Sequence, residues 1–151
     1  MRKDNLIMSV LNLDQKITVD NKKVVQIGGK EYELIFNDKF AKLVADMQLK
    51  VAEATKGFDD DDKLKKFAKK EYAEQKEQLM AAFDEGKKIV IDALDQLLGK
   101  GEGERLYKYY NESTQALTTL VALLNKEANE AVRETKAKNR AERRAKYNKN
   151  H

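Results

Sequence analysis

Apolar residues between positions 64 and 98 recur at intervals of three or four residues, or at sums of these intervals. This spacing is typical of one face of an α-helix. A continuous helix over residues 64–98 would be about 50 Å long and could not bury its apolar face alone. The stripe consists of Leu64, Ala68, Tyr72, Leu79, Phe83, Val90, Leu94 and Leu97. Its second half is widened by Ile89, Ile91 and Leu98, so we expect that half to be the more buried.

The period changes to two between residues 16 and 36, as is typical of β-strands with one buried face. The pattern predicts a three-stranded antiparallel meander with turns at Asp20-Asn21 and Gly28-Gly29, because these pairs tolerate the positive φ angles of two-residue hairpin turns. Gly28-Gly29 could also begin a phosphate-binding loop, but neither a third glycine nor a Lys-Ser/Thr pair follows. The alternating residues are Ile17, Val19, Val25, Ile27, Tyr32, Leu34 and Phe36.

A helix is predicted directly after these strands. Asn37 or Asp38 can cap it by accepting the free amide donors of its first turn. We expect Gly57 to end this helix as its C′ residue. Its apolar face consists of Phe40, Leu43, Val44, Met47, Val51 and Ala54.

Glycines then divide the second half of the chain. Gly86 either bends the long helix or admits a close neighbour. Residues 99–103 form a glycine-rich loop, followed by a short helix rich in tyrosine, whose rings either stack nucleobases or lie half-buried in the core. Asn111 or Ser113 can cap the last helix, whose large apolar residues end at Val132.

These patterns together predict a mainly α fold of the α+β type. A small N-terminal antiparallel β-hairpin or meander precedes a bundle of three to four helices, one of them long. Residues 1–132 form a single helical domain with an N-terminal arm, and residues 133–151 form a basic C-terminal tail that is either helical or disordered. The arm, residues 1–13, lacks a small-residue cleavage site, which favours packing on a core or a neighbour over a signal peptide.

The sequence offers no recognisable catalytic, cofactor or metal centre. It contains no cysteine, and its only histidine is His151. The acidic run Asp59–62 lacks the alternating ligands and the glycine of a calcium loop, so we expect it to be a solvated loop that places negative charge at the N-terminus of the long helix. The lysines of residues 63–70 form either a solvated helix face or an anion-binding face. We therefore predict a protein that is not an enzyme, and no stretch is long enough to span a membrane.

The net charge of +4 is unevenly distributed. Residues 133–151 contain eight Lys/Arg and two Glu, for a net charge of +6, which leaves −2 for residues 1–132. A basic tail can bind nucleic acid through phosphate contacts. It can equally serve as a solubilising or partner-docking tail, because Glu134 and Glu142 interrupt the charge.

Three motifs resemble the small tail assembly chaperones of long-tailed phages (siphophage type) that infect Gram-positive bacteria. Gly28-Gly29-Lys30-Glu31-Tyr32-Glu33-Leu34 resembles the strand hairpin that opens many of these proteins. Gly99-Lys100-Gly101-Glu102-Gly103-Glu104-Arg105 is similar to their glycine-and-acid loop. Asn139-Arg140-Ala141-Glu142-Arg143-Arg144-Ala145 resembles their basic ending, although the Ser-Pro that often precedes it is replaced by Ala137-Lys138.

The resemblance implies a chaperone that binds the tape measure protein, helps to recruit major tail tube subunits, acts in the host cytoplasm and is absent from the finished virion. Several such families also make a longer product by ribosomal frameshifting. We expect residues 1–13 or the apolar end of the helix over residues 64–98 to mediate self-association, in the form of an open spiral if the contact is head to tail. The alternatives are a nucleic-acid-binding protein and a structural or scaffold protein of the particle. The predicted partner-binding residues are Leu6, Ile7, Val10, Leu11, Phe83, Ile89, Ile91, Arg140, Arg143 and Arg144.

Overall fold

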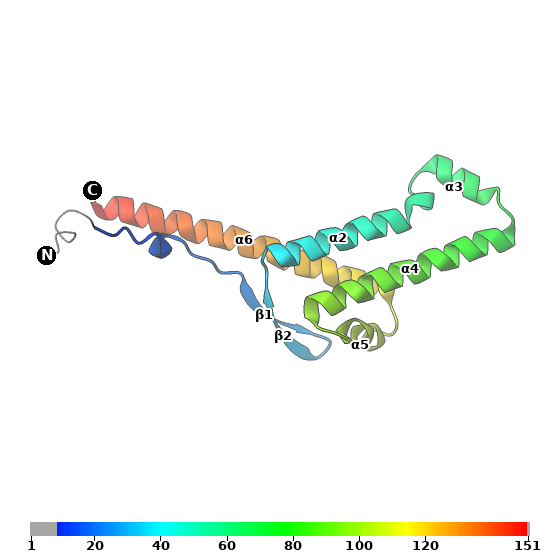
Figure 1. The fold of residues 1–151 in the computed structure, drawn as a ribbon, viewed down its shortest axis with the longest axis horizontal. Coiled ribbons are helices and arrows are strands. Elements are labelled where there is room, and N and C mark those ends of the chain that lie inside the picture. The colour runs from blue at the N-terminus through cyan, green and yellow to red at the C-terminus, as the bar shows by residue number, and fades with distance from the viewer. Residues whose placement is uncertain (1–8, 151) are drawn as a thin grey trace. The chain divides into compact units, whose positions relative to one another are not determined.

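The computed structural model describes residues 9–150 and is mainly helical, with one two-stranded antiparallel hairpin (Figure 1). The chain divides into two units, each described by itself below: unit 1 comprises residues 1–21 and 129–151, and unit 2 comprises residues 22–128. The elements are η1 (Leu13–Lys16), β1 (Lys22–Ile27), β2 (Lys30–Ile35), α2 (Asp38–Ala54), η2 (Lys56–Phe58), α3 (Asp61–Ala68), α4 (Tyr72–Leu98), α5 (Glu102–Tyr109) and α6 (Thr114–Asn150).

The hairpin at Gly28-Gly29 is confirmed. β1 pairs with β2 in a register that places Val25 opposite Tyr32. The two glycines have φ values of 58° and 75°, which non-glycine residues rarely adopt and which a type I′ turn requires at both positions. Alternate residues of the two strands, Ile27, Tyr32 and Leu34, are buried.

The prediction of a three-stranded meander is wrong for its first strand, because the segment around Ile17 and Val19 is not a strand. Instead, the backbone amides of this segment bond to side chains of α6 within unit 1. The Thr18 amide donates to Asn139 Oδ1 at 2.7 Å, and the Asp20 amide donates to Thr135 Oγ1 at 3.2 Å. The backbone amides that would bond to a neighbouring strand thus bond to side-chain oxygens of α6 instead.

The cap of α2 is confirmed, since the amide of Phe40 donates to Asn37 Oδ1 at 3.1 Å. The end of α2 was predicted wrongly: the C-cap is Thr55, and Gly57 lies inside the following 3₁₀ turn. The Thr55 hydroxyl donates to the carbonyl of Val51 at 2.9 Å, so a side chain satisfies one of the last carbonyls of the helix.

The predicted continuous helix over residues 64–98 is also wrong, because the chain breaks between α3 and α4. Glu71 has the extended values φ −60° and ψ 148°. The side-chain amide of Gln75 donates to the carbonyls of Ala68 and Lys70, at 3.1 and 2.8 Å, which stabilises the break. The acidic run lies at the start of a helix, with Asp60 capping α3, but that helix is the short α3 and not the long helix α4, because of the break at Glu71.

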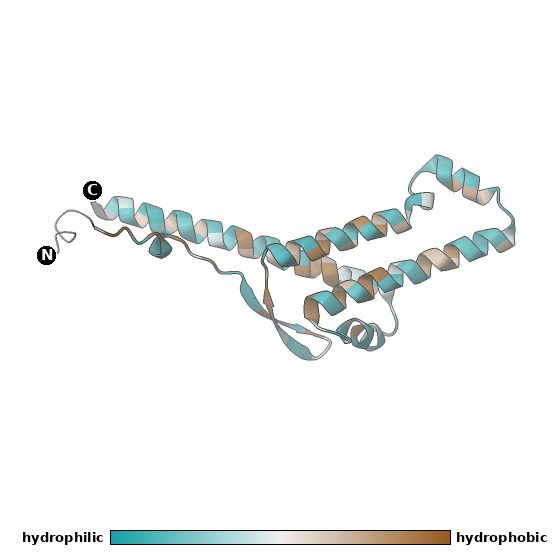
Figure 2. Ribbon diagram, in the orientation of Figure 1, coloured by the Kyte–Doolittle hydropathy of each residue, from teal (hydrophilic) through white to brown (hydrophobic). Residues whose placement is uncertain are grey.

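The core of unit 2 lies around the second half of α4. Its largest fully buried side chains are Val90 and Leu94 of α4, Leu106 of α5, and Leu117 and Val121 of α6. Figure 2 shows hydrophobic and hydrophilic residues alternating around α2, as expected for a helix with one buried face. The cap of α6 is Ser113, whose hydroxyl accepts from the amide of Ala116 at 3.1 Å.

α5 packs very closely on α4 at Gly103. A Cβ added to Gly103 would lie 2.3 Å from the carbonyl oxygen of Ile91. The amide of Gly103 donates to Asp95 Oδ1 at 2.7 Å, which fixes the start of α5 on α4. Gly86, by contrast, has no atom of another residue within 4 Å of such a Cβ, so the predicted close neighbour is not found there.

Candidate partner-binding surfaces

The apolar stripe of α4 is covered along only half of its length. In the second half, Val90 is 2% exposed and Leu94 is 0% exposed. In the first half, Tyr72 is 77% exposed and Phe83 is 64% exposed, and Leu79 between them is also exposed. Because these five positions are separated by sums of three and four residues, they belong to one face of the helix. Unit 2 therefore leaves residues 72–83 of this stripe uncovered, and we call Tyr72, Leu79 and Phe83 the α4 stripe.

The other predicted partner-binding residues of α4 lie elsewhere. Ile89 is buried in the core of unit 2, so it is not available at the surface of unit 2. Ile91 is half-buried, and its carbonyl faces Gly103 of α5. Of the three predicted positions on α4, only Phe83 is exposed. Helical spacing places the three residues on different faces of α4, but it does not show which face the rest of unit 2 covers.

The segment of unit 1 that precedes β1, residues 9–20, lies on α6 through polar contacts. It extends beyond the predicted arm of residues 1–13, and we call residues 9–20 the arm from here on. The Thr18 hydroxyl donates to Glu142 Oε1 at 2.7 Å, and the ammonium of Lys138 forms an ion pair with Asp20. These contacts add to the two amide bonds from Thr18 and Asp20 to Asn139 and Thr135.

The large apolar residues of the arm face away from these contacts. Val10 is 94% exposed, and Leu11, Leu13, Ile17 and Val19 are all more than half exposed. The predicted residues Leu6 and Ile7 lie outside the described part of the chain.

The predicted arginines lie on α6, on the face that does not hold the arm. Residues 135, 138, 139 and 142 contact the arm, whereas Arg140, Arg143 and Arg144 are exposed and share a helix face with Arg133 and Lys136 by three- and four-residue spacing. None of these five basic side chains forms an ion pair among the described residues. We call them the basic stripe. α6 continues to Asn150, so the basic end of the chain is helical within the described range.

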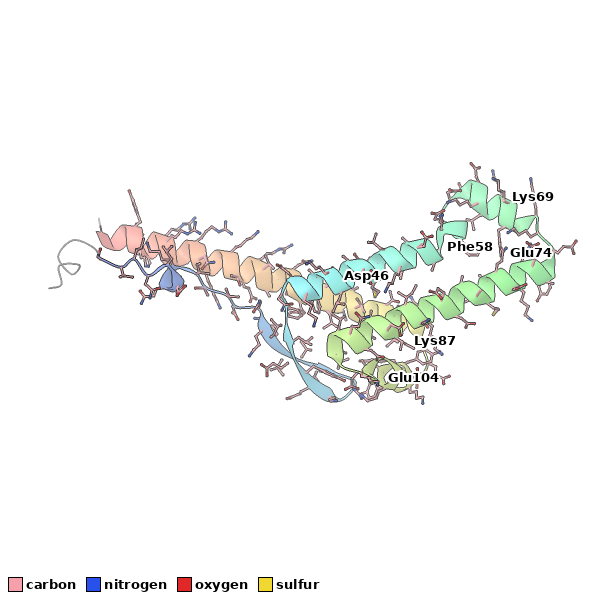
Figure 3. All side chains as sticks on the ribbon, in the orientation of Figure 1. Asp46, Phe58, Lys69, Glu74, Lys87 and Glu104 are labelled. Atoms are coloured by element: carbon pink, nitrogen blue, oxygen red, sulfur yellow. The ribbon has the colours of Figure 1, made fainter. Side chains whose placement is uncertain are left out.

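An open cleft of about 710 Å³ lies between the end of α2, η2, α3 and the first half of α4. Figure 3 labels Phe58, Lys69 and Glu74, which lie on successive elements at this end of unit 2. On one side, the rings of Phe58 and Phe67 meet edge to face, with centroids 4.9 Å apart. We call it the lysine-lined cleft, because three lysines, Lys63, Lys66 and Lys70, line it. The rest of its lining is Ala54, Gly57, Gln78, Ala81, Ala82 and Glu85.

Sequence reasoning missed a polar network that joins the first two motifs of the family resemblance. From the second motif, Arg105 donates to the carbonyl of Gly28 at 3.1 Å and to the hydroxyl of Tyr32 at 2.6 Å. Glu102, almost buried, forms ion pairs with Lys30 and Arg105. The hydrogen bonds from Lys30, and then from Arg105, lower the pKa of Glu102 to about 2. The network is structural: it fastens the hairpin turn to α5.

Among residues 9–150, no three carboxylate or imidazole side chains gather as a metal site. In the same range, no helix combines the length and the apolarity needed to cross a bilayer. No family model, curated protein or solved structure matches this chain.

Proposed function

We propose that this protein is a tail assembly chaperone that binds the tape measure protein during phage tail assembly. The observation that carries the proposal is the α4 stripe, an apolar helix face that the chain's own fold leaves uncovered over residues 72–83. Large apolar residues that are exposed along one helix face of a folded protein are typical of sites that bind another helix. The three sequence motifs support the choice of a tail assembly chaperone.

The geometry of the α4 stripe fits a helical partner. Tyr72 and Phe83 are eleven residues apart, which corresponds to about 16 Å along a helix axis. An amphipathic helix lying alongside would meet apolar side chains at i, i+7 and i+11, which is the pattern used when helices bind in grooves or against other helices. A tape measure protein is a very long, apolar helical rod, so many copies of a chaperone with one such stripe could cover it.

Glutamate substitutions at the α4 stripe test this proposal. Leu79→Glu and Phe83→Glu should leave the fold intact, because both side chains are exposed, but they should abolish co-purification with a co-expressed tape measure protein. Leu49→Glu is the matched control, since Leu49 on α2 is more exposed than either stripe residue, at 71%, and lies outside the stripe. Undiminished co-purification of both stripe variants would contradict the proposal.

The arm is the proposed surface for self-association. Its apolar residues, among them Ile17 and Val19, are exposed on an extended segment next to α6, where another copy of the chain could contact them. If the contact is head to tail, the copies form an open spiral around the tape measure protein. Ile17→Asp with Val19→Asp should reduce the mass measured by light scattering at high protein concentration. A monomeric wild-type protein under the same conditions would refute self-association.

Further parts of the proposal follow from the resemblance alone. The protein would act in the host cytoplasm, would contact major tail tube subunits during assembly and would be absent from the finished virion. Mass spectrometry of purified virions tests the last point, because a scaffold protein that stays in the particle would be detected there.

The basic stripe favours a second candidate function, binding of nucleic acid. Its five cations lie on one face of α6, where they could contact consecutive phosphates. Neutralising about five phosphates would give a slope near −4.5 in a plot of log affinity against log salt concentration. A slope of this size that is lost in the variant with Arg140, Arg143 and Arg144 changed to Gln would favour this function. Salt-independent or absent binding would exclude it.

A further inference from the structure

We infer that the lysine-lined cleft binds an amphipathic helix that carries an apolar anchor side chain and acidic residues beside it. This site is separate from the α4 stripe, because the cleft is lined by Gln78, Ala81, Ala82 and Glu85, whose positions lie on another face of α4. The inference does not depend on the identity of the partner proposed above.

The walls of the cleft provide an apolar pocket with room for an inserted side chain. Phe58 and Phe67 form an aromatic wall. Ala81 and Ala82 stand on the α4 side, and such small residues leave space for a large side chain and let a partner helix approach closely. α3 and η2 contribute no fully buried residue, so this end of unit 2 can adjust to an occupant at little cost in packing.

The charges at the cleft select an acidic partner. Lys63, Lys66 and Lys70 recur on one side of α3 and the turn after it, against the lone carboxylate of Glu85 in the lining. Lys63 is already paired with Asp59 at 2.9 Å and with Asp60 at 3.8 Å. Lys70 is paired with Glu74 at 3.9 Å and bonded to Gln78 at 3.0 Å.

Lys66 is the cation that remains available. Within residues 9–150 its ammonium has no hydrogen-bond or ion-pair partner. A partner carboxylate placed one helical turn from the inserted apolar side chain could meet Lys66, because residues three or four apart share a helix face.

Several features favour a helix over a small molecule. The cleft is open rather than enclosed, whereas small-molecule sites bury most of their ligand. Its cations Lys63 and Lys66 are three residues apart on α3, which matches acidic residues at helical spacing on a facing helix. The chain's own exposed apolar helix face, the α4 stripe, is flanked by Lys76 rather than by acids, so a second copy is the less suitable occupant.

Two fluorescent peptides test the inference with the full-length protein. Both are helical and about 20 residues long, with the same leucine stripe; one carries Glu beside the stripe and the other carries Lys at the same positions. Fluorescence anisotropy should show micromolar binding of the Glu peptide and at least about tenfold weaker binding of the Lys peptide. Equal affinity for both peptides, or no binding of the Glu peptide, would overturn the inference.

Three variants locate the site. Lys66→Glu should weaken binding of the Glu peptide about tenfold, whereas Lys65→Glu, an equal charge change on α3 outside the lining of the cleft, should weaken it much less. Ala82→Trp, which fills the cleft, should also weaken binding, and circular dichroism would verify its fold. Equal losses for Lys66→Glu and Lys65→Glu would indicate non-specific attraction and would refute the site. Loss of self-association in Lys66→Glu, without peptide binding by the wild type, would assign the cleft to a second copy instead.

Discussion

Gly103 offers a sharp test of how α5 packs on α4. Replacing glycine by alanine inside a helix normally stabilises a protein, by up to about 1 kcal/mol. At Gly103 the new methyl group would lie 2.3 Å from the carbonyl oxygen of Ile91 and 2.9 Å from Asp95 Oδ1. The first obstacle is backbone, which cannot rotate away. We therefore expect Gly103→Ala to destabilise the protein, against the ordinary trend.

The expected cost can be worked out from these distances. A carbon–oxygen contact is comfortable at about 3.3 Å, so α5 would have to move by about 1 Å. Overpacking of this kind costs about 1–3 kcal/mol. The movement would also stretch the 2.7 Å bond from the Gly103 amide to Asp95 and loosen the packing of Leu106, which is fully buried. After the gain in helix propensity is subtracted, the net loss should be about 2 kcal/mol.

Gly86→Ala is the matched control, because it makes the same chemical change inside α4 where nothing lies within 4 Å of the new Cβ. It should stabilise the protein by about 0.5–1 kcal/mol. Urea and thermal unfolding followed by circular dichroism would separate the two variants, with a fall in Tm of about 4–8 °C for Gly103→Ala and a small rise for Gly86→Ala. If both substitutions stabilise the protein equally, the close approach of α5 to α4 is incorrect.

Two other predictions concern charge and core packing. The pKa of Glu102 lies at about 2 in the folded protein, below its ordinary value of 4.5, so its ionised form stabilises the fold above about pH 4.5 and this contribution is lost as the pH falls towards 2. The difference in urea midpoint between wild type and Glu102→Gln should therefore shrink on acidification, and a constant difference would show that the carboxylate is not held by Lys30 and Arg105. Leu94→Ala should cost about 2–5 kcal/mol, because Leu94 is fully buried, whereas Leu123→Ala, at an exposed site of α6, should change the free energy of unfolding by less than about 0.5 kcal/mol. Similar midpoints for the two leucine variants would place Leu94 outside the core.

Local patterns predicted those parts of the fold that depend on neighbouring residues. The Gly28-Gly29 hairpin needs only the two positive φ angles that glycine permits. The caps at Asn37 and Ser113 need only a side-chain oxygen three residues before a free amide. Each of these features is decided within a few residues, so the sequence pattern is sufficient.

The break between α3 and α4 shows where a periodic pattern fails. Ala68 and Tyr72 are four residues apart, so the apolar spacing continues across the break. What ends α3 is the reach of the Gln75 side chain back to two carbonyls, together with the extended backbone at Glu71. Hydrophobic periodicity reports which face is apolar, and it does not report whether the backbone bonds continue.

Candidate surfaces were harder to predict than elements, because exposure depends on distant parts of the chain. Phe83 and Val90 belong to the same apolar stripe, yet only Phe83 is exposed, since the rest of unit 2 covers the second half of α4. The ion pair of Glu102 with Lys30 joins residues 72 positions apart. Spacing along the sequence cannot reveal such contacts, although the two motifs that provide them were recognised separately.

The sequences of both the arm and α6 determine that the apolar residues of the arm are exposed. In an extended segment, a shift of one residue would turn Ile17 and Val19 inward and Thr18 outward. Full burial of the two apolar side chains would contribute about 1.5–3 kcal/mol each. The observed arrangement is nevertheless the polar one, because α6 presents Thr135, Lys138, Asn139 and Glu142 to the arm, and these groups would lose their partners after such a shift.

The third motif thus has two separate uses. Asn139 and Glu142 hold the arm in the register that exposes its apolar residues, while Arg140, Arg143 and Arg144 lie on another face of α6. A sequence selected only for a stable monomer would gain more from an apolar contact between arm and helix. The polar contact is therefore better explained if the apolar edge of the arm is kept for another protein, as the proposed self-association requires.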